Sequence, residues 1–305
     1  RLIWLGLWFF YVTNWIGQDY FSPQGLNFFL YLVIIAILLK WFNVSPAAMP
    51  HIRRQRWRHL GRFSLLAHRL YTWLTAPDTL RTPSQPRQRI ALLVILVVIF
   101  ALVVFSHPLT PFFVLASVTA LVIFRRCTPR WLPILMAAMT GAWIIIMTRP
   151  YLASLITADF GQVSTTITSN VTDLVQGSPE HIFIADIRIL MTALIWGLAL
   201  VGGVRRLHRG YGDVTYVLLA VAPFPLLVAQ SYGGEMLLRI YLFTLPLMAF
   251  FAAALFYTTS RHETSRWATA AVVGISIVLL VGFLFTRYGN ERTDYKTYAE
   301  VDGAR

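Results

Sequence analysis

Seven residues near the ends of apolar stretches are of types that can do chemistry at a membrane surface. Three could move a proton, since they are two carboxylates and an imidazole, namely Asp19, Glu235 and His107. Four could bind an anionic or sugar-bearing substrate, namely Arg149, Arg188, Tyr232 and Arg239. Because ionisable groups at membrane depth are expensive to desolvate, each of these residues is a functional candidate.

Asp19 ends the first apolar stretch inside the segment Asn14-Trp15-Ile16-Gly17-Gln18-Asp19-Tyr20-Phe21-Ser22-Pro23. Its aromatic neighbours could desolvate the carboxylate and make it more basic, as a general base at neutral pH requires. The alternative is a solvated acid at the end of a helix that takes no part in chemistry.

Glu235 and Arg239 are four residues apart, so on a helix they would share one face. The preceding Gly233-Gly234 would let the backbone approach a ligand closely. This spacing predicts a base next to an anion-binding arginine. The alternative is an intrahelical ion pair with a structural role.

The remaining candidates are not part of a recognisable sequence pair. His107 lies in the turn Ser106-His107-Pro108-Leu109-Thr110-Pro111, where it could shuttle a proton, bind a phosphate or cap the turn. Arg149 and Arg188 flank apolar stretches on the side that is otherwise poor in cations. Arginines there favour an anionic ligand such as a lipid phosphate or diphosphate, which a planar guanidinium binds through paired hydrogen bonds.

About nine apolar stretches must position these residues, and each is long enough or nearly long enough to cross a bilayer. They lie at 2–16, 26–42, 90–105, 112–124, 131–147, 187–204, 214–230, 240–257 and 268–285. The gaps between them alternate in charge, since 10 of the 13 acidic residues fall in one set and 18 of the 26 Lys and Arg in the other. Because Lys and Arg accumulate in short cytoplasmic loops, the pattern predicts an all-α, polytopic transmembrane helix bundle in the plasma membrane.

Three hydrophilic segments are longer than the other gaps or differ from them in composition. Segment 43–89 has nine arginines and one acid, so we expect it on the cytoplasmic side against anionic lipids. Segment 148–186 places apolar residues three or four apart, which predicts amphipathic helices in the outer interface or, alternatively, a plain connector. We expect the polar tail 286–305 outside. We expect 1–305 to be a single transmembrane domain and a fragment of a longer protein, since Arg1 stands directly against an apolar run.

The composition argues against several other classes of protein. The chain is 57% hydrophobic and only 13% charged, which is too little charge to cover a soluble domain. The net charge of +13 sits in loops on one side rather than in one groove, which argues against nucleic-acid binding. The single Cys127 cannot form an internal disulfide. No nucleotide motif is present, and although outer carboxylates could hold a divalent metal ion, no spacing requires one and no metal ligand is assigned.

Three stretches resemble segments of large polytopic proteins of actinobacterial type that are treated as membrane glycosyltransferases or polysaccharide polymerases of the cell envelope. They are 14–24, 106–111 and the stretch from Tyr232-Gly233-Gly234-Glu235 through Arg239. The resemblance implies a GT-C-like helix bundle with its active site on the extracytoplasmic face and a polyprenyl-phosphate-linked sugar as donor. In such enzymes a carboxylate in an early outer loop acts on the acceptor hydroxyl. Asp19 matches that role loosely, and if an earlier outer loop precedes Arg1, the base lies there instead.

The predicted function is transfer of a sugar or sugar polymer from a polyprenyl-phosphate-linked donor to a hydroxyl acceptor in cell-envelope polysaccharide synthesis, without a nucleotide. The two carboxylates would take the acceptor's proton, His107 would assist, and the four binding residues would hold the donor. The alternative is a transporter or flippase for a lipid-linked or hydrophobic solute, which predicts broken helices. The candidate positions for such breaks are Gly202-Gly203, Pro223 and Pro225. A third hypothesis is a non-catalytic scaffold.

Overall fold

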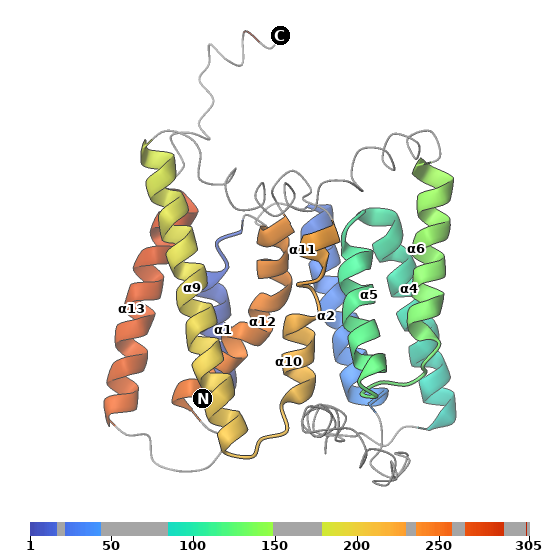
Figure 1. Cartoon of the computed structure of the whole chain (residues 1–305), viewed down its shortest axis with the longest axis horizontal. Coiled ribbons are helices and arrows are strands. Elements are labelled where there is room, and N and C mark those ends of the chain that lie inside the picture. The colour runs from blue at the N-terminus through green and yellow to red at the C-terminus, as the bar shows by residue number, and fades with distance from the viewer. Residues whose placement is uncertain are drawn as a thin grey trace, which may run out of the picture. The chain divides into compact units, whose positions relative to one another are not determined.

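A computed structural model describes residues 1–16, 22–43, 85–148, 179–229, 236–257, 266–289 and 303. Helices make up most of these residues and no β-strand occurs among them, so the all-α prediction is confirmed for this part of the chain. The helices, labelled in Figure 1, are α1 (Leu2–Thr13), α2 (Pro23–Trp41), α4 (Pro86–Ser106), α5 (Thr110–Ile123), α6 (Leu132–Thr148), α9 (Pro179–His208), α10 (Val214–Val221), α11 (Leu226–Ala229), α12 (Met236–Phe256) and α13 (Arg266–Tyr288).

Five of the described helices are long and apolar enough to cross a membrane, namely α2, α4, α9, α12 and α13. Eight of the nine predicted stretches each coincide with one helix and the ninth, 214–230, with two, but α1, α5 and α6 are only 12, 14 and 17 residues long. A helix that crosses the hydrocarbon core alone needs about 20 residues. The structure therefore supports a membrane protein with five candidate spans and does not confirm nine.

The stretch predicted at 214–230 is not one helix. α10 ends at Val221, and α11 begins at Leu226 after the turn Ala222-Pro223-Phe224-Pro225. Two prolines in this turn remove backbone donors and clash with the preceding turn of a helix, which explains the break. In contrast, Gly202-Gly203 lies inside the continuous α9 and breaks nothing.

Two helices also begin earlier in the structure than the sequence predicts. α9 begins at Pro179, so the last part of segment 148–186 belongs to that helix. α4 begins at Pro86, so Arg87 and Arg89 lie in its first turn rather than in a loop. Residues 44–84 and 149–178, where the basic loop and the amphipathic outer helices are predicted, lie outside the described residues, as does most of the tail.

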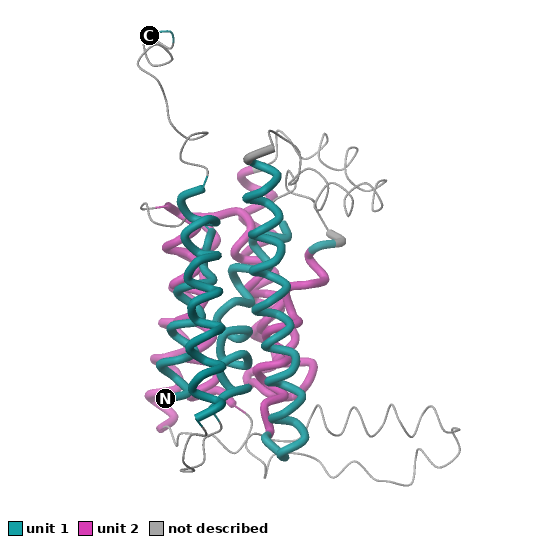
Figure 2. Tube along the Cα trace, turned by 90° about the vertical axis from the view of Figure 1, so that its left-hand side faces the viewer, with its two compact units in different colours: residues 1–17, 162–211, 227–305 teal, residues 18–161, 212–226 magenta. Residues whose placement is uncertain are grey.

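The chain divides into two compact units, coloured in Figure 2. Unit 1 comprises 1–17, 162–211 and 227–305, and unit 2 comprises 18–161 and 212–226. In unit 1, α12 packs against α9 and α1, and α13 packs against α9 and α1. In unit 2, α2 packs against α4 and α5, and α5 packs against α6 and α10.

Close helix contacts build the core of unit 1. A Cβ atom at Gly202 of α9 would collide with the backbone oxygen of Phe251 in α12, so the two helices approach without a side chain between them. On α12, Ala249 and Ala253 lie beside Gly6 of α1, and Ala249, Ala252 and Ala253 are fully or almost fully buried. Small residues are what let helices in lipid pack backbone to backbone, since apolar burial alone favours no helix partner there.

Buried polar side chains join the helices of unit 2. Asn27 of α2 is fully buried, and its amide donates to the backbone oxygen of Pro23 at 2.6 Å and to the hydroxyl of Ser106 in α4 at 2.8 Å. Tyr31 of α2 shares a hydrogen bond of 3.1 Å with Ser117 of α5. Hydrogen bonds of this kind between apolar helices help to select helix partners inside a membrane.

Rows of exposed apolar side chains run along the outer helices. On α4, Ile90, Val94, Val98 and Leu102 follow one another at intervals of four residues and are 65%, 56%, 54% and 53% exposed. Such a contiguous apolar surface is unfavourable in water and favourable against lipid. The rows therefore agree with the five candidate spans in favouring a membrane location.

Candidate functional site in unit 1

Arg188 of α9 is the predicted binding residue whose surroundings the structure describes most fully. Its guanidinium carbon lies 5.3 Å from the centroid of the Trp15 ring, which is a cation–π contact. Its Nη2 donates a hydrogen bond of 3.1 Å to the backbone oxygen of Thr286 in the last turn of α13. Three segments distant in sequence thus fix the position of this half-buried positive charge.

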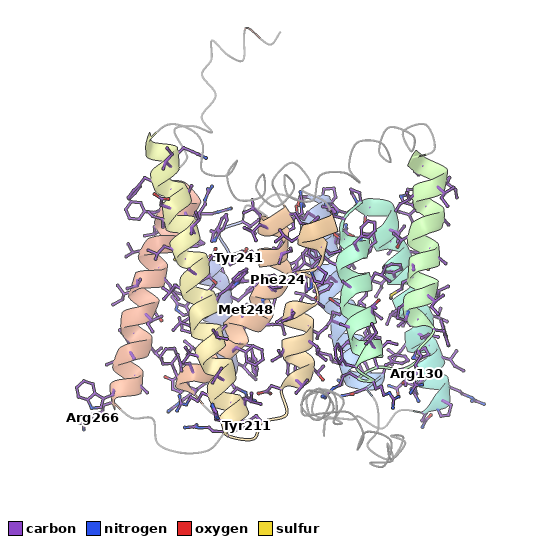
Figure 3. All side chains as sticks on the ribbon, in the orientation of Figure 1. Arg130, Tyr211, Phe224, Tyr241, Met248 and Arg266 are labelled. Atoms are coloured by element: carbon purple, nitrogen blue, oxygen red, sulfur yellow. The ribbon has the colours of Figure 1, made fainter. Side chains whose placement is uncertain are left out.

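Three aromatic side chains lie next to one another, beginning with the ring that Arg188 contacts. Trp15, which is 8% exposed, stacks on Tyr241 of α12 with centroids 5.5 Å apart and planes at 28°. Trp196 of α9 lies 6.5 Å from Tyr241 at an angle of 37°. Figure 3 shows Tyr241 in the upper half of α12. We call Arg188, Trp15, Tyr241 and Trp196 the arginine–aromatic cluster.

The end of α1 places Trp15 in this cluster. The helix stops at Thr13, whose hydroxyl donates back to the Phe9 oxygen at 2.6 Å, and Asn14 leaves the helical conformation. The last carbonyl groups of a helix have no partner within it. The Tyr241 hydroxyl supplies one by donating to the Thr13 oxygen at 2.6 Å. The bond ties the end of α1 to α12 next to the Trp15 ring.

One buried polar atom beside the cluster lacks a hydrogen-bond partner in the described part of the chain. It is the acceptor Oδ1 of Asn14, the residue directly before Trp15. A buried polar atom left without a partner costs about 1–3 kcal/mol, so native structures rarely contain one without a reason. A ligand hydroxyl could satisfy this atom, because a hydroxyl donates one hydrogen bond.

The structure places the other predicted residues in several ways. Arg239 is half-buried in the first turn of α12, two residues before Tyr241, and so belongs to the same unit as the cluster. Four predicted residues lie outside the described part of the chain, namely Asp19, Arg149, Tyr232 and Glu235. Their roles stay predictions.

His107, in unit 2, acts as a cap of α5. Its Nδ1 atom accepts hydrogen bonds from the backbone N–H groups of Leu109 and Thr110, both at 3.3 Å, and lies 3.1 Å from the Thr110 hydroxyl. These groups stand at the start of the helix, where backbone donors need partners. The contacts favour the turn-capping alternative over proton transfer at this nitrogen.

The opposite end of unit 1 holds two arginines that the sequence indicated only as topology signals. Arg205 of α9 donates to the backbone oxygen of Leu255 at the end of α12. Arg206 is 6% exposed, with its guanidinium carbon 4.1 Å from the Tyr211 ring and 5.2 Å from the Phe250 ring. Cations at helix C-termini interact favourably with the helix dipole, so these contacts stabilise the packing of α9 on α12.

The sequence does not single out Tyr241, Trp196 or Thr286 as members of the site. Each of them lies close to a predicted residue. Tyr241 comes two residues after Arg239 on α12, Trp196 comes two turns after Arg188 on α9, and the Thr286 oxygen accepts a hydrogen bond from Arg188. An amphipathic or heptad pattern relates residues of one helix only. Nothing in a single sequence therefore pairs Trp15 with Arg188.

Neither a group of metal ligands nor a similarity to known proteins assigns the site a function. Among the described residues, no three His, Cys, Asp or Glu side chains gather in a way that could hold a metal ion. No protein-family model matches the chain, and no curated protein or solved structure matches it either. The arginine–aromatic cluster is accordingly the strongest guide to function.

Proposed function

We propose that this protein is a plasma-membrane enzyme that transfers a sugar from a polyprenyl-phosphate-linked donor to a hydroxyl acceptor on the extracytoplasmic face. The observation that carries this proposal is the Arg188 guanidinium held over Trp15, next to the unpartnered Oδ1 atom of Asn14. A guanidinium binds phosphate, an aromatic ring packs on apolar ligand surface, and a sugar hydroxyl can donate to an unpartnered acceptor.

The transfer requires a base, a phosphate ligand and an acceptor. The acceptor oxygen attacks the anomeric carbon while the bond from that carbon to the phosphate oxygen breaks, and polyprenyl phosphate leaves with the bonding electrons. The acceptor's proton passes to a carboxylate, for which Asp19 and Glu235 are the candidates. Arg188 stabilises the negative charge that grows on the leaving phosphate. The remaining candidates for holding the donor are Arg149, Tyr232 and Arg239.

A transfer assay with purified protein tests this proposal. The protein is incubated in lipid nanodiscs with a radiolabelled polyprenyl-phosphate sugar and a glycan acceptor, without nucleotide. We expect covalent product from the wild type and at least about tenfold less from Arg188→Gln, since each 1.4 kcal/mol of lost transition-state stabilisation slows a reaction about tenfold. Arg287→Gln is the matched control, because it removes a cation from the residue next to Thr286 but not from the cluster.

Two results would contradict the assignment. Equal product from Arg188→Gln and the wild type would remove Arg188 from the site. Absence of any covalent product from wild-type protein, with solute crossing the bilayer instead, would reject the enzyme.

A transporter or flippase is the second candidate, and the break between α10 and α11 favours it. Unwound backbone at membrane depth is tolerated where it lines a cavity or is buried in protein, and transporters use such breaks to bind solutes. Flux of a fluorescent lipid-linked sugar across proteoliposomes tests this function. We expect Pro223→Ala combined with Pro225→Ala to rejoin the helix and lower flux if the protein is a transporter, but to leave sugar transfer unchanged if it is a transferase.

A further inference from the structure

One end of unit 2, where α2 and α5 finish and α4 and α6 begin, concentrates positive charge. We call it the basic end, and its cations are Lys40, Arg87, Arg89, Arg125, Arg126 and Arg130. Among the described residues of unit 2 the only carboxylate is Asp213, at the start of α10. Figure 3 labels Arg130 at this end.

The helix ends that carry these cations are bound to one another. The Nη2 atom of Arg89 donates to the Thr128 hydroxyl at 3.2 Å, and its guanidinium carbon lies 5.6 Å from the ring of Phe42. The backbone N–H of Thr128 donates to the Phe42 oxygen at 2.9 Å, and Asn43 forms a β-bridge with Cys127. The start of α4, the end of α2 and the turn after α5 therefore form one fixed platform.

The six cations of the basic end differ in exposure, and Arg89 and Arg125 are half-buried. Arg126 is 3% exposed and its Nη1 donates to the Thr215 hydroxyl of α10 at 3.3 Å, so it supports the packing of the unit. Lys40, Arg87 and Arg130 are exposed. The exposed group stands within three residues of the contacts that fix the platform, and it is available to a ligand.

Orientation of the chain in the membrane does not account for this arrangement. The positive-inside rule concerns the number of Lys and Arg in short loops and sets no requirement for joined helix ends. Arg87 and Arg89 also lie in the first turn of α4, where the positive end of the helix dipole disfavours cations. A bound anion would offset both the mutual repulsion of the cations and the unfavourable dipole.

The surroundings favour a lipid over a soluble anion. The exposed row on α4 begins at Ile90, directly after Arg89, and continues at Val94. Trp131, next to Arg130, is 47% exposed, and tryptophan is enriched at the level of lipid head groups. A molecule with a phosphate at the basic end and acyl chains along α4 would satisfy both surfaces.

We propose that the basic end of unit 2 binds the phosphate of an anionic phospholipid, with Arg87 and Arg130 contacting the head group and Arg89 fixed behind them. Each cation close to an anionic lipid surface adds attraction, and a fixed set adds selectivity for the anionic head group. The site is independent of the sugar transfer proposed for unit 1.

Native mass spectrometry of the detergent-purified protein tests the site. Wild-type protein is mixed with equal amounts of phosphatidylglycerol and phosphatidylcholine, and the retained lipids are counted. We expect at least about a fivefold preference for phosphatidylglycerol, reduced at least about threefold in the variant Arg87→Gln with Arg130→Gln, because each lost cation removes attraction to the anionic head group. Both side chains are exposed, so the variant should keep its thermal unfolding midpoint.

The matched control is Arg209→Gln with Arg266→Gln, which removes two exposed cations from unit 1. The control should retain phosphatidylglycerol as the wild type does. An equal loss in the control and the test variant would show general surface charge and overturn the site. No preference for phosphatidylglycerol would also overturn it, and full displacement of the lipid by millimolar glycerol phosphate would identify a soluble anion as the ligand instead.

Discussion

The hydroxyl of Tyr241 donates a hydrogen bond of 2.6 Å to the backbone oxygen of Thr13. Both residues are buried, and the bond joins the end of α1 to α12 next to the arginine–aromatic cluster. Since Trp15 stacks on the same tyrosine ring, Tyr241 holds both the backbone and the side chain at this end of unit 1.

Tyr241→Phe should destabilise the protein by about 0.5–1.5 kcal/mol, because the ring remains but the buried Thr13 oxygen loses one of its two donors and keeps only the backbone N–H of Trp15. The thermal unfolding midpoint in detergent measures the effect. Tyr11→Phe is the control, since it removes a hydroxyl from a residue that is 65% exposed and keeps the ring packed on Phe283. Equal midpoints for the two variants would show that the Tyr241 hydroxyl has no structural role.

Gly202→Ala should destabilise unit 1 by about 1–3 kcal/mol, because the added Cβ meets the backbone oxygen of Phe251 and overpacks the contact. Gly197→Ala, on the same helix, is the control because nothing lies within 4 Å of its Cβ position. We expect that substitution to be neutral or slightly stabilising, since alanine favours a helix over glycine. A midpoint for Gly202→Ala at or above that of Gly197→Ala would contradict the close packing of α9 and α12.

His107→Ala should lower stability by about 1 kcal/mol, because the first N–H groups of α5 lose their acceptor. His107→Asn should recover most of this loss, since asparagine also accepts from backbone N–H groups at the start of a helix. Chemical denaturation in detergent compares the two variants. If sugar transfer falls equally in both while their stabilities match the wild type, His107 has a chemical role and the capping interpretation is wrong.

Cys127 should resist thiol reagents at neutral pH. It is 2% exposed, and burial raises the pKa of its thiol to about 12, so the reactive thiolate is scarce. An unfolded chain loses this proton at lower pH than the folded one, so the contribution of Cys127 disfavours the folded state increasingly as pH rises above about 9.

Maleimide labelling measures this prediction, with Arg130→Cys as an exposed control three residues away. Labelling of that variant at pH 7 and none of the wild type is the expected pair of results. Labelling of wild-type Cys127 at a similar rate would show that the turn after α5 opens.

The sequence predicts the apolar helices well where hydropathy alone decides. α4 and α13 follow from uninterrupted apolar runs, and their observed bounds exceed the predicted stretches by only a few residues at each end. Hydropathy alone fails where backbone chemistry interrupts an apolar run, as at Pro223 and Pro225, which end α10 although every neighbour is apolar. The two prolines themselves are the sequence signal for this break.

The site is harder to predict than the helices because it is assembled across them. Arg188 stands out in the sequence as a cation on the side predicted to be poor in cations, and in the structure it contacts Trp15 and Thr286. Its partners Trp15 and Thr286 carry no such signal, since tryptophan and threonine are common near helix ends in membranes. Only packing of α9 against α1 and α13 brings the three together.

Gly202 also bears on how distant relatives of this protein can be recognised. The atom that a larger residue would meet belongs to the Phe251 backbone, so no substitution of the partner side chain can create room for it. At Gly282, in contrast, the obstacle is the flexible side chain of Met191, so a smaller residue at position 191 could make room for a side chain at position 282. Glycine should therefore be conserved at position 202 in more distant homologues than the residues around it. An alignment of divergent homologues can be anchored on this glycine better than on the loop motifs.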